Sequence, residues 1–204
     1  MLFRSGITAP GNDPAALTVG AVDLHNSAKR SDDSVARYSS KGPTLFDLAL
    51  KPDLVAPGSR VVSAEAAGSY LSTMYPERHV AGSGANAYMA LSGTSMAAGV
   101  TSGAVALLLD EKPKLSPEAV KAVLQLSSSP IGQQGLLSAG AGSLNALAAA
   151  LLLKQTPAAA VAISNDKIVG ERILLGGLTT TADGAVQVLA RRLNADGQVI
   201  RSSS

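Results

Sequence analysis

The residues most able to do chemistry form the run LSGTSMAA at positions 91–98. Ser95 lies where a tight Gly-Thr turn leads into a helix that is apolar or small on every side. The start of a helix leaves backbone N–H groups without partners and carries partial positive charge, so an oxyanion forming beside Ser95 would be stabilised there. Gly93, Ala97 and Ala98 are small enough to let a substrate backbone approach. These residue types fit a nucleophilic serine, and they also fit a serine that only caps the helix.

Both histidines of the chain are interpreted as surface residues rather than as partners of Ser95. His79 lies 16 residues before Ser95 in a polar, Gly-rich stretch, and His25 follows a predicted strand. Polar stretches of this kind usually form surface loops. The segment Gly82–Ala87 loosely fits a dinucleotide-binding fingerprint, but no strand precedes it and no acidic residue follows at the required distance. We therefore predict a loop there and no cofactor site.

The composition excludes several classes of function. The chain has 204 residues with 17 Lys plus Arg and 15 Asp plus Glu, so its net charge of +2 gives no electrostatic case for nucleic-acid binding. The absence of cysteine excludes a disulfide framework, a thiolate nucleophile and a cysteine-ligated metal, and two histidines make a multi-histidine metal site improbable. Apolar residues make up 46% and aromatic residues 3%, which predicts a core of Ala, Val, Leu and Gly.

Two uncharged stretches, residues 79–109 and 123–153, have the length of a membrane span. Both are dense in Gly, Ser, Asn or Gln and lack 18 consecutive apolar residues, so we predict buried helices flanked by loops and no membrane span. Residues 1–10 contain no apolar run of the length found in a secretory signal. No localisation follows from the sequence.

The elements that must position Ser95 alternate between short strands and helices. Strands are predicted at 15–22, 53–56 and 61–64, a loop or edge strand at 23–37, and a surface insertion at 69–86. Helices are predicted at 95–109, from Ser116 onward, and at 143–153; the first is apolar all round and so belongs in the middle of a domain. Residues 157–204 carry hairpin signals at 183–184 and 196–197. This alternation predicts an α/β layer fold. Because no convincing helix precedes Ser95, the chain has the character of the later part of a larger domain.

Five short motifs together resemble the subtilisin-like serine peptidases. The first resemblance is the Ser95 run, Gly93 to Ala98, which is similar to the nucleophile signature of that family. The others are similar to family stretches in the same order along the chain: Thr18–Val22, Tyr38–Pro43, Lys51–Gly58 and Gly140–Ala146. The motifs cover roughly residues 14–153. Tyr38, within the second of these stretches, and Phe46 are interpreted as packing residues.

The resemblance implies a three-layer α/β fold with a mostly parallel sheet, and peptide-bond hydrolysis through an acyl-enzyme on Ser95. It implies that the backbone N–H of Ser95 is one oxyanion donor, and that an Asn side chain lying earlier in the family's sequence is the other. Asn12 precedes the strand in a turn and does not match that Asn. Residues 1–153 correspond to the C-terminal portion of the peptidase domain, and 154–204 to a linker and a partial β-rich appendage. The implied substrate is a protein or peptide, and no cofactor is expected.

Two departures from the family pattern shape the prediction. Gly99 stands where the family usually has proline, and a block matching the family's triad Asp and His is missing upstream of Ser95. We therefore expect a fragment that is inactive alone, in which Ser95 is the catalytic residue of a longer protein. The alternatives are a non-catalytic remnant that serves as a binding module, and a half-enzyme completed in trans by a separate N-terminal chain. Some family members bind calcium near the position of Asp53, although a structural aspartate at a turn is the preferred interpretation.

Overall fold

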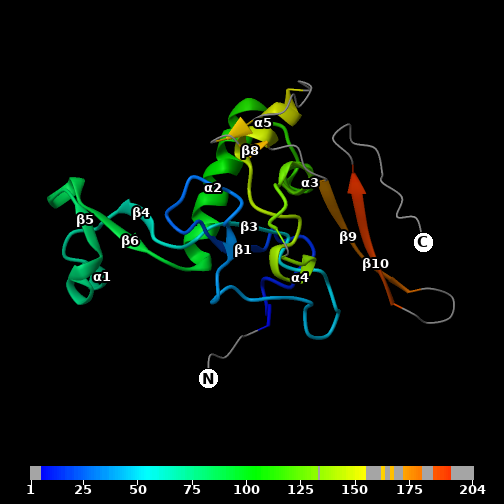
Figure 1. Ribbon diagram of the computed structural model, residues 1–204, viewed down its shortest axis with the longest axis horizontal. Coiled ribbons are helices and arrows are strands. Elements are labelled where there is room, and N and C mark those ends of the chain that lie inside the picture. The colour runs from blue at the N-terminus through cyan, green and yellow to red at the C-terminus, as the bar shows by residue number, and fades with distance from the viewer. Residues whose placement is uncertain are drawn as a thin grey trace.

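The computed structural model describes residues 6–132 and 134–154, and beyond these the backbone of strands at 162–163, 166–167, 172–180 and 186–193. At its centre, the long helix α2 (Thr94–Glu111) packs on a small sheet that contains β1 (Val19–Asp23) and β3 (Leu54–Pro57), as Figure 1 shows. The core between them is aliphatic, as the composition predicts. Its fully buried members include Ala21, Leu54, Ala56, Ala97, Leu108, Leu124 and Ala149.

The first sheet has the order β2-β1-β3. β1 and β3 run parallel with Val19 opposite Leu54, and the short strand β2 (Ser34–Val35) pairs antiparallel with the end of β1. Beyond β3, a parallel bridge joins Val55 to Ser143. β1 and β3 correspond to the strands predicted at 15–22 and 53–56, although β1 begins four residues later than predicted, at Val19. β2 is the edge strand that the prediction for residues 23–37 allowed. The mostly parallel sheet and the three-layer architecture stay predictions, because the sheets of the described residues are small.

The second sheet is antiparallel and leads directly into α2. Its order is β4-β6-β5, with β4 at Val61–Ala64, β5 at His79–Ala81 and β6 at Tyr88–Leu91. Between β4 and β6 the chain also forms the short helix α1 (Tyr70–Met74) and single 3-10 turns at Pro76–Arg78 and Gly84–Asn86. In Figure 1 this unit extends away from the body of the protein, with β5 and α1 at its far end. The predicted insertion at 69–86 therefore belongs to a projecting, largely exposed unit that comprises β4, α1, β5 and β6 and is called the arm below.

Three shorter helices follow α2. Ser116 caps α3 (Pro117–Ser127) by accepting a hydrogen bond from the N–H of Ala119, so the predicted start of this helix is confirmed. α4 comprises Leu136–Ala139, and α5 comprises Ala146–Leu153. The prediction that the last helix begins at Ser143 is wrong by three residues, because Ser143 pairs with Val55 and Ser129 instead.

The prediction that α2 is buried on every side is wrong. Only one stripe of the helix is buried, formed by residues at helical spacing: Ala97, Thr101, Ala104 and Leu108. The opposite face is open, and Leu107 on it is 65% exposed. No residue with a charged side chain occurs on α2 before Asp110, so this open face lacks the charges that usually mark the outer side of a surface helix.

At the C-terminal end, β9 (Arg172–Thr180) and β10 (Val186–Leu193) pair antiparallel and lie beside α3 (Figure 1). They flank residues 183–184, so the first hairpin signal is confirmed. The second hairpin signal, at 196–197, lies outside the described residues. Two further two-residue strands, β7 (Ala162–Ile163) and β8 (Asp166–Lys167), also pair antiparallel. Among the described residues, no helix is long and apolar enough to cross a membrane.

Candidate active site

Ser95 is the second residue of α2 and is exposed. The N-cap of the helix is Gly93, whose carbonyl oxygen accepts hydrogen bonds from the N–H groups of Met96 (3.1 Å) and Ala97 (3.3 Å). The Ser95 hydroxyl makes no hydrogen bond to the described residues. The interpretation of Ser95 as a helix cap is therefore wrong, since the cap position belongs to a glycine.

The first turn of α2 has the groups that an oxyanion needs. With the N–H groups of Met96 and Ala97 bonded to Gly93, those of Thr94 and Ser95 have no partner in the part of the chain that the structure describes. They lie at the positive end of an 18-residue helix that has no acidic residue in its first turn. A developing negative charge beside Ser95 would meet N–H donors that are already in place.

Three of the five motifs converge on the turn that precedes Ser95. The N–H of Gly93 donates to the carbonyl oxygen of Gly58 at 2.8 Å, and the N–H of Arg60 donates to the Ser92 hydroxyl at 2.8 Å. Gly58 is packed so closely that a Cβ added to it would lie 2.6 Å from the Cβ of Ala21 and 2.9 Å from the Gly93 oxygen. Only glycine therefore fits where the loop after β3 meets the turn before α2.

Tyr38 makes a contact that the sequence did not indicate. Its hydroxyl donates to the same Gly58 oxygen at 2.7 Å and lies 2.9 Å from the Ser59 hydroxyl. No local signal in the sequence connects these positions, which are 20 residues apart. The interpretation of Phe46 as a packing residue is wrong, because its side chain is 94% exposed.

Neither histidine is bonded to Ser95. His79 lies on β5 at the far end of the arm (Figure 1), where its Nδ1 is 2.7 Å from Oε2 of Glu65. The Nε2 of His25 is 2.9 Å from the Ser34 hydroxyl. Both are exposed, as predicted. The described residues thus present a serine and oxyanion donors but no imidazole in hydrogen-bond contact with the serine.

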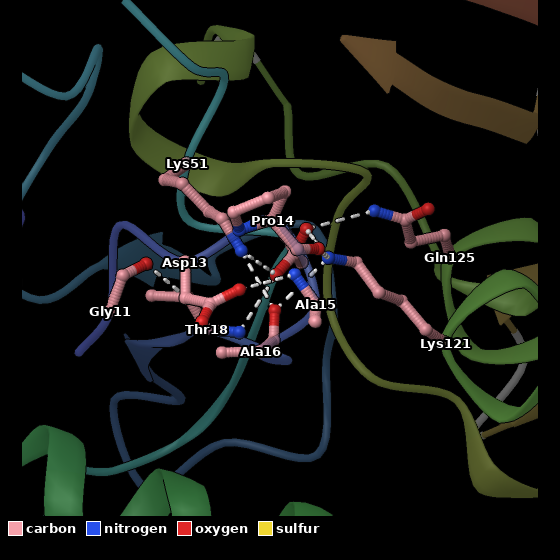
Figure 2. Close-up of polar contacts among 10 residues, drawn as sticks. Gly11, Asp13, Pro14, Ala15, Ala16, Thr18, Lys51, Lys121 and Gln125 are labelled. Carbon is pink, nitrogen blue, oxygen red and sulfur yellow. Dashed lines mark hydrogen bonds and ion pairs between the residues drawn. The ribbon is translucent and has the colours of Figure 1, made fainter. Parts of the chain in front are cut away.

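Asp53 belongs to a buried cluster of charged and polar side chains, whose other members Lys51, Lys121 and Gln125 are labelled in Figure 2. Its Oδ2 accepts hydrogen bonds from Lys51 Nζ at 2.8 Å and from the Thr18 N–H at 2.7 Å. Its Oδ1 lies 3.0 Å from Lys121 Nζ and accepts from Gln125 Nε2 at 3.2 Å. Lys121 and Gln125 come from α3, so one carboxylate ties that helix to the entrance of β1 and the start of β3.

The two ammonium groups of this cluster also hold the chain before β1. Lys51 donates to the Ala16 carbonyl at 2.8 Å, and Lys121 donates to the carbonyls of Pro14 (2.8 Å) and Ala16 (3.0 Å). Burial lowers the pKa of Lys51 from its ordinary 10.5, while the Asp53 carboxylate acts in the opposite direction. Both oxygens of Asp53 are thus occupied by donors in a structural role. Among the described residues, no group of three or more His, Cys, Asp or Glu is arranged to hold a metal ion.

A hollow of about 210 Å³ lies beside the first residue of α2. It is bordered by Thr94, by residues 6–8 and 18–20, and by Ser39, Ser40 and Pro52. Val19 and Gly20 line the hollow on the side of β1 where β2 pairs only with Val22 and Asp23, so that no strand of the described ranges lies beside them there. The open side of the first sheet therefore comes close to the start of the Ser95 helix.

Comparison with known proteins connects this arrangement to one family. The model of the subtilase family, Peptidase_S8, matches residues 4–152. The serine protease AprX of Bacillus subtilis (strain 168) is 36% identical over 140 residues, which are 69% of this chain and 30% of AprX. The minor extracellular protease Vpr of the same organism is 37% identical over 97 residues, which are 48% of this chain and 10% of Vpr.

Solved structures of proteases are also similar to this chain. The patellamide maturation protease PatA is 28% identical with a TM-score of 0.51, over 72% of this chain and 46% of that one. Fervidolysin from Fervidobacterium pennivorans, a keratinolytic enzyme related to subtilisin, covers 94% of this chain and 27% of its own, with 19% identity and a TM-score of 0.54. That last likeness concerns the fold alone. The chain thus spans less than half the length of the AprX and PatA chains it resembles.

Proposed function

The chain belongs to the subtilase family, and we propose that Ser95 is its nucleophile in the hydrolysis of peptide bonds. The observation that carries this proposal is the position of Ser95, which is exposed on the first turn of α2. Its hydroxyl and the N–H groups of Thr94 and Ser95 have no hydrogen-bond partner among the described residues. The Ser95 Oγ attacks the scissile carbonyl while a base removes its proton. The resulting oxyanion is bound by the Ser95 N–H, and the amine leaves with a proton to give an ester on Ser95. Water then cleaves this ester and regenerates the hydroxyl.

The base and its carboxylate partner are supplied, in this proposal, by polypeptide other than the described residues. The whole chain has two histidines, and the side chains of both are held by other residues. Because loss of one triad member costs roughly 10⁴–10⁶ in turnover, the 204 residues alone would be almost inactive. The completing polypeptide is either continuous with this chain in a longer protein or a separate chain that acts in trans.

Two surfaces support the existence of such a completing polypeptide. The outer face of α2 is uncharged over four turns, although a helix exposed on this scale normally carries charges. In the part of the chain that the structure describes, no strand lies beside the Val19–Gly20 edge of β1, and unpaired strand edges tend to pair with another chain. Both border the first turn of α2. A polypeptide that covered them would bring its side chains to Ser95.

A fluorophosphonate probe, which reacts with activated serines, tests the proposal. The 204-residue chain would be labelled alone and after mixing with the part of AprX outside the matched residues, which supplies a completing polypeptide of the same family. We expect almost no labelling of the chain alone and labelling after mixing. Ser95→Ala should abolish the labelling. Ser102→Ala is the matched control, because Ser102 is exposed on the same helix and its hydroxyl donates to the Ala98 carbonyl.

The control variants also separate the alternatives. Labelling that persists in Ser95→Ala would contradict the assignment of the nucleophile. Labelling of the chain alone that requires Ser95 would show that a base is present within it, and the trans alternative would then be unnecessary. A non-catalytic binding module would bind the completing polypeptide without any labelling of Ser95.

A further inference from the structure

We propose that Tyr38 is a positioning residue for Ser95, acting through the carbonyl group of Gly58. This inference rests on the proposed function of Ser95 and adds a residue that its chemistry does not itself require. The hydrogen bonds of the Tyr38 hydroxyl in the described part of the chain go to Gly58 and Ser59, and none goes to Ser95. The phenol bonds to the backbone group that fixes the turn from which the Ser95 helix begins.

The hydrogen bonds form a continuous path over three segments of the chain. The Tyr38 hydroxyl donates to the Gly58 oxygen at 2.7 Å, and that oxygen also accepts the Gly93 N–H at 2.8 Å. Gly93 is the N-cap of α2, and Ser95 follows two residues later. A carbonyl oxygen has two lone pairs, so the two donors use its full capacity. The position of the Gly58 carbonyl is therefore set from both sides.

The glycine at the N-cap makes this support necessary. A Ser, Thr, Asp or Asn at that position would fix the start of the helix with its own side chain, whereas Gly93 makes no such bond. The only restraint on its N–H from the described residues is the Gly58 oxygen. The hydrogen bond from Tyr38 therefore supplies part of the restraint that a capping side chain normally provides.

Tyr38 is itself held firmly enough to act in this way. Its phenol has a single proton, which it gives to Gly58, so the Ser59 hydroxyl at 2.9 Å donates to the phenol oxygen. The next residue, Ser39, is 2% exposed, and its hydroxyl accepts the Ala21 N–H of β1 at 3.0 Å. Tyr38 is therefore anchored to the central sheet on one side and bonded to the Gly58 loop on the other.

Amide exchange of the full chain by NMR tests the inference without relying on catalysis. In Tyr38→Phe, we expect the Gly93 N–H to exchange about fivefold faster, as the loss of one ordinary hydrogen bond predicts. The carbonyl carbon signal of Gly58 should move upfield, because that oxygen loses one of its two donors. Exchange at Leu108, at the other end of α2, should stay unchanged. Tyr88→Phe is the matched control, because Tyr88 is exposed to a similar degree (47% against 42%) and lies on β6, which leads into the same turn.

The outcomes distinguish this inference from the proposed function. If Gly93 exchange and the Gly58 carbon signal stay the same in Tyr38→Phe, the positioning role is wrong. An equal acceleration at Gly93 and Leu108 would also overturn it, because the phenol would then stabilise the fold as a whole. Neither readout uses the reactivity of Ser95. A failure of Ser95 to label with a fluorophosphonate after mixing with the completing polypeptide would therefore overturn the proposed function and leave the contact between Tyr38 and the turn intact.

Discussion

Replacing Asp53 with asparagine should destabilise the protein more than the loss of a hydrogen bond would. The Asp53 side chain is 4% exposed and is the counter-charge for two ammonium groups, those of Lys51 (3% exposed) and Lys121 (19%). Breaking a buried ion pair from one side costs about 3–5 kcal/mol, because the remaining charge stays buried without compensation. For a chain of this length, that corresponds to a fall in Tm of roughly 6–20 °C.

The same substitution should change how stability depends on pH. Burial already holds the pKa of Lys51 below its ordinary 10.5, and Asp53→Asn removes the carboxylate that opposes this effect. A base whose pKa is lower in the folded state destabilises the fold fully while it is protonated in both states, and this cost is relieved as the pH rises toward the unfolded value. The stability of Asp53→Asn should therefore rise toward pH 10.5 more steeply than that of the wild type. Adding Lys51→Met should remove most of this rise.

Urea unfolding followed by circular dichroism is the suitable assay, since the chain has no tryptophan to report by fluorescence. Asp13→Asn is the matched control, because Asp13 is an exposed acid beside the cluster (Figure 2) whose Oδ1 accepts only the Ala15 N–H. A loss below about 1 kcal/mol in Asp53→Asn would refute the reasoning, because an intact buried pair should cost more. So would a stability that falls as the pH rises. If EDTA destabilised the wild type but not Asp53→Asn, Asp53 would instead be a cation ligand.

Two further predictions concern the contact between Thr44 and Asp47 and the open face of α2. The Thr44 hydroxyl is the main cause that lowers the pKa of Asp47 from 3.8, so Thr44→Val should return that pKa toward 3.8 in an NMR titration. The stabilisation linked to Asp47, present above pH 3.8 and lost as the pH falls through its lowered pKa, should then become smaller; an unchanged titration would contradict this. Gly103→Ala should stabilise the chain by about 0.5–1 kcal/mol in urea unfolding, since an added Cβ would meet no atom within 4 Å and alanine favours a helix. A destabilisation would show that another part of the protein covers α2 there.

The parts of the fold that could be predicted are those with local causes. β4 occupies residues 61–64 as predicted, because a short apolar run there is bounded by turn residues. α3 begins after Ser116 because a serine followed by proline is a strong start signal. Gly58 and Gly93 each lie in a motif that the sequence shows. The hydrogen bond between them could not be predicted, because it joins two loops 35 residues apart.

The Asp53 cluster could not be predicted for a different reason. Lys51 lies two residues from Asp53 and invites a local interpretation, but Gln125 lies 72 residues away and Lys121 comes from the same helix. The stripe of apolar residues on α3 predicts which face packs inward, without indicating which polar side chains at its border will reach a buried carboxylate. The sequence therefore suggested an aspartate at a turn, whereas the folded chain uses it to join a helix to two strands.

The composition of α2 predicts a helix buried on every side, yet one face of the helix is open among the described residues. A helix with no charged residue before Asp110, and with Gly99, Ser102 and Gly103 on its open face, has the composition of a helix packed on all sides. Each glycine inside a helix costs about 1 kcal/mol relative to alanine, and the space around both would accept a side chain. Nothing in the described residues compensates for that cost. The cost is explained if another backbone lies close to this face. Ser95 likewise needs another polypeptide beside it, because no base contacts it among the described residues. The composition of the helix and the chemistry of its first turn therefore favour the same completing polypeptide, on independent grounds.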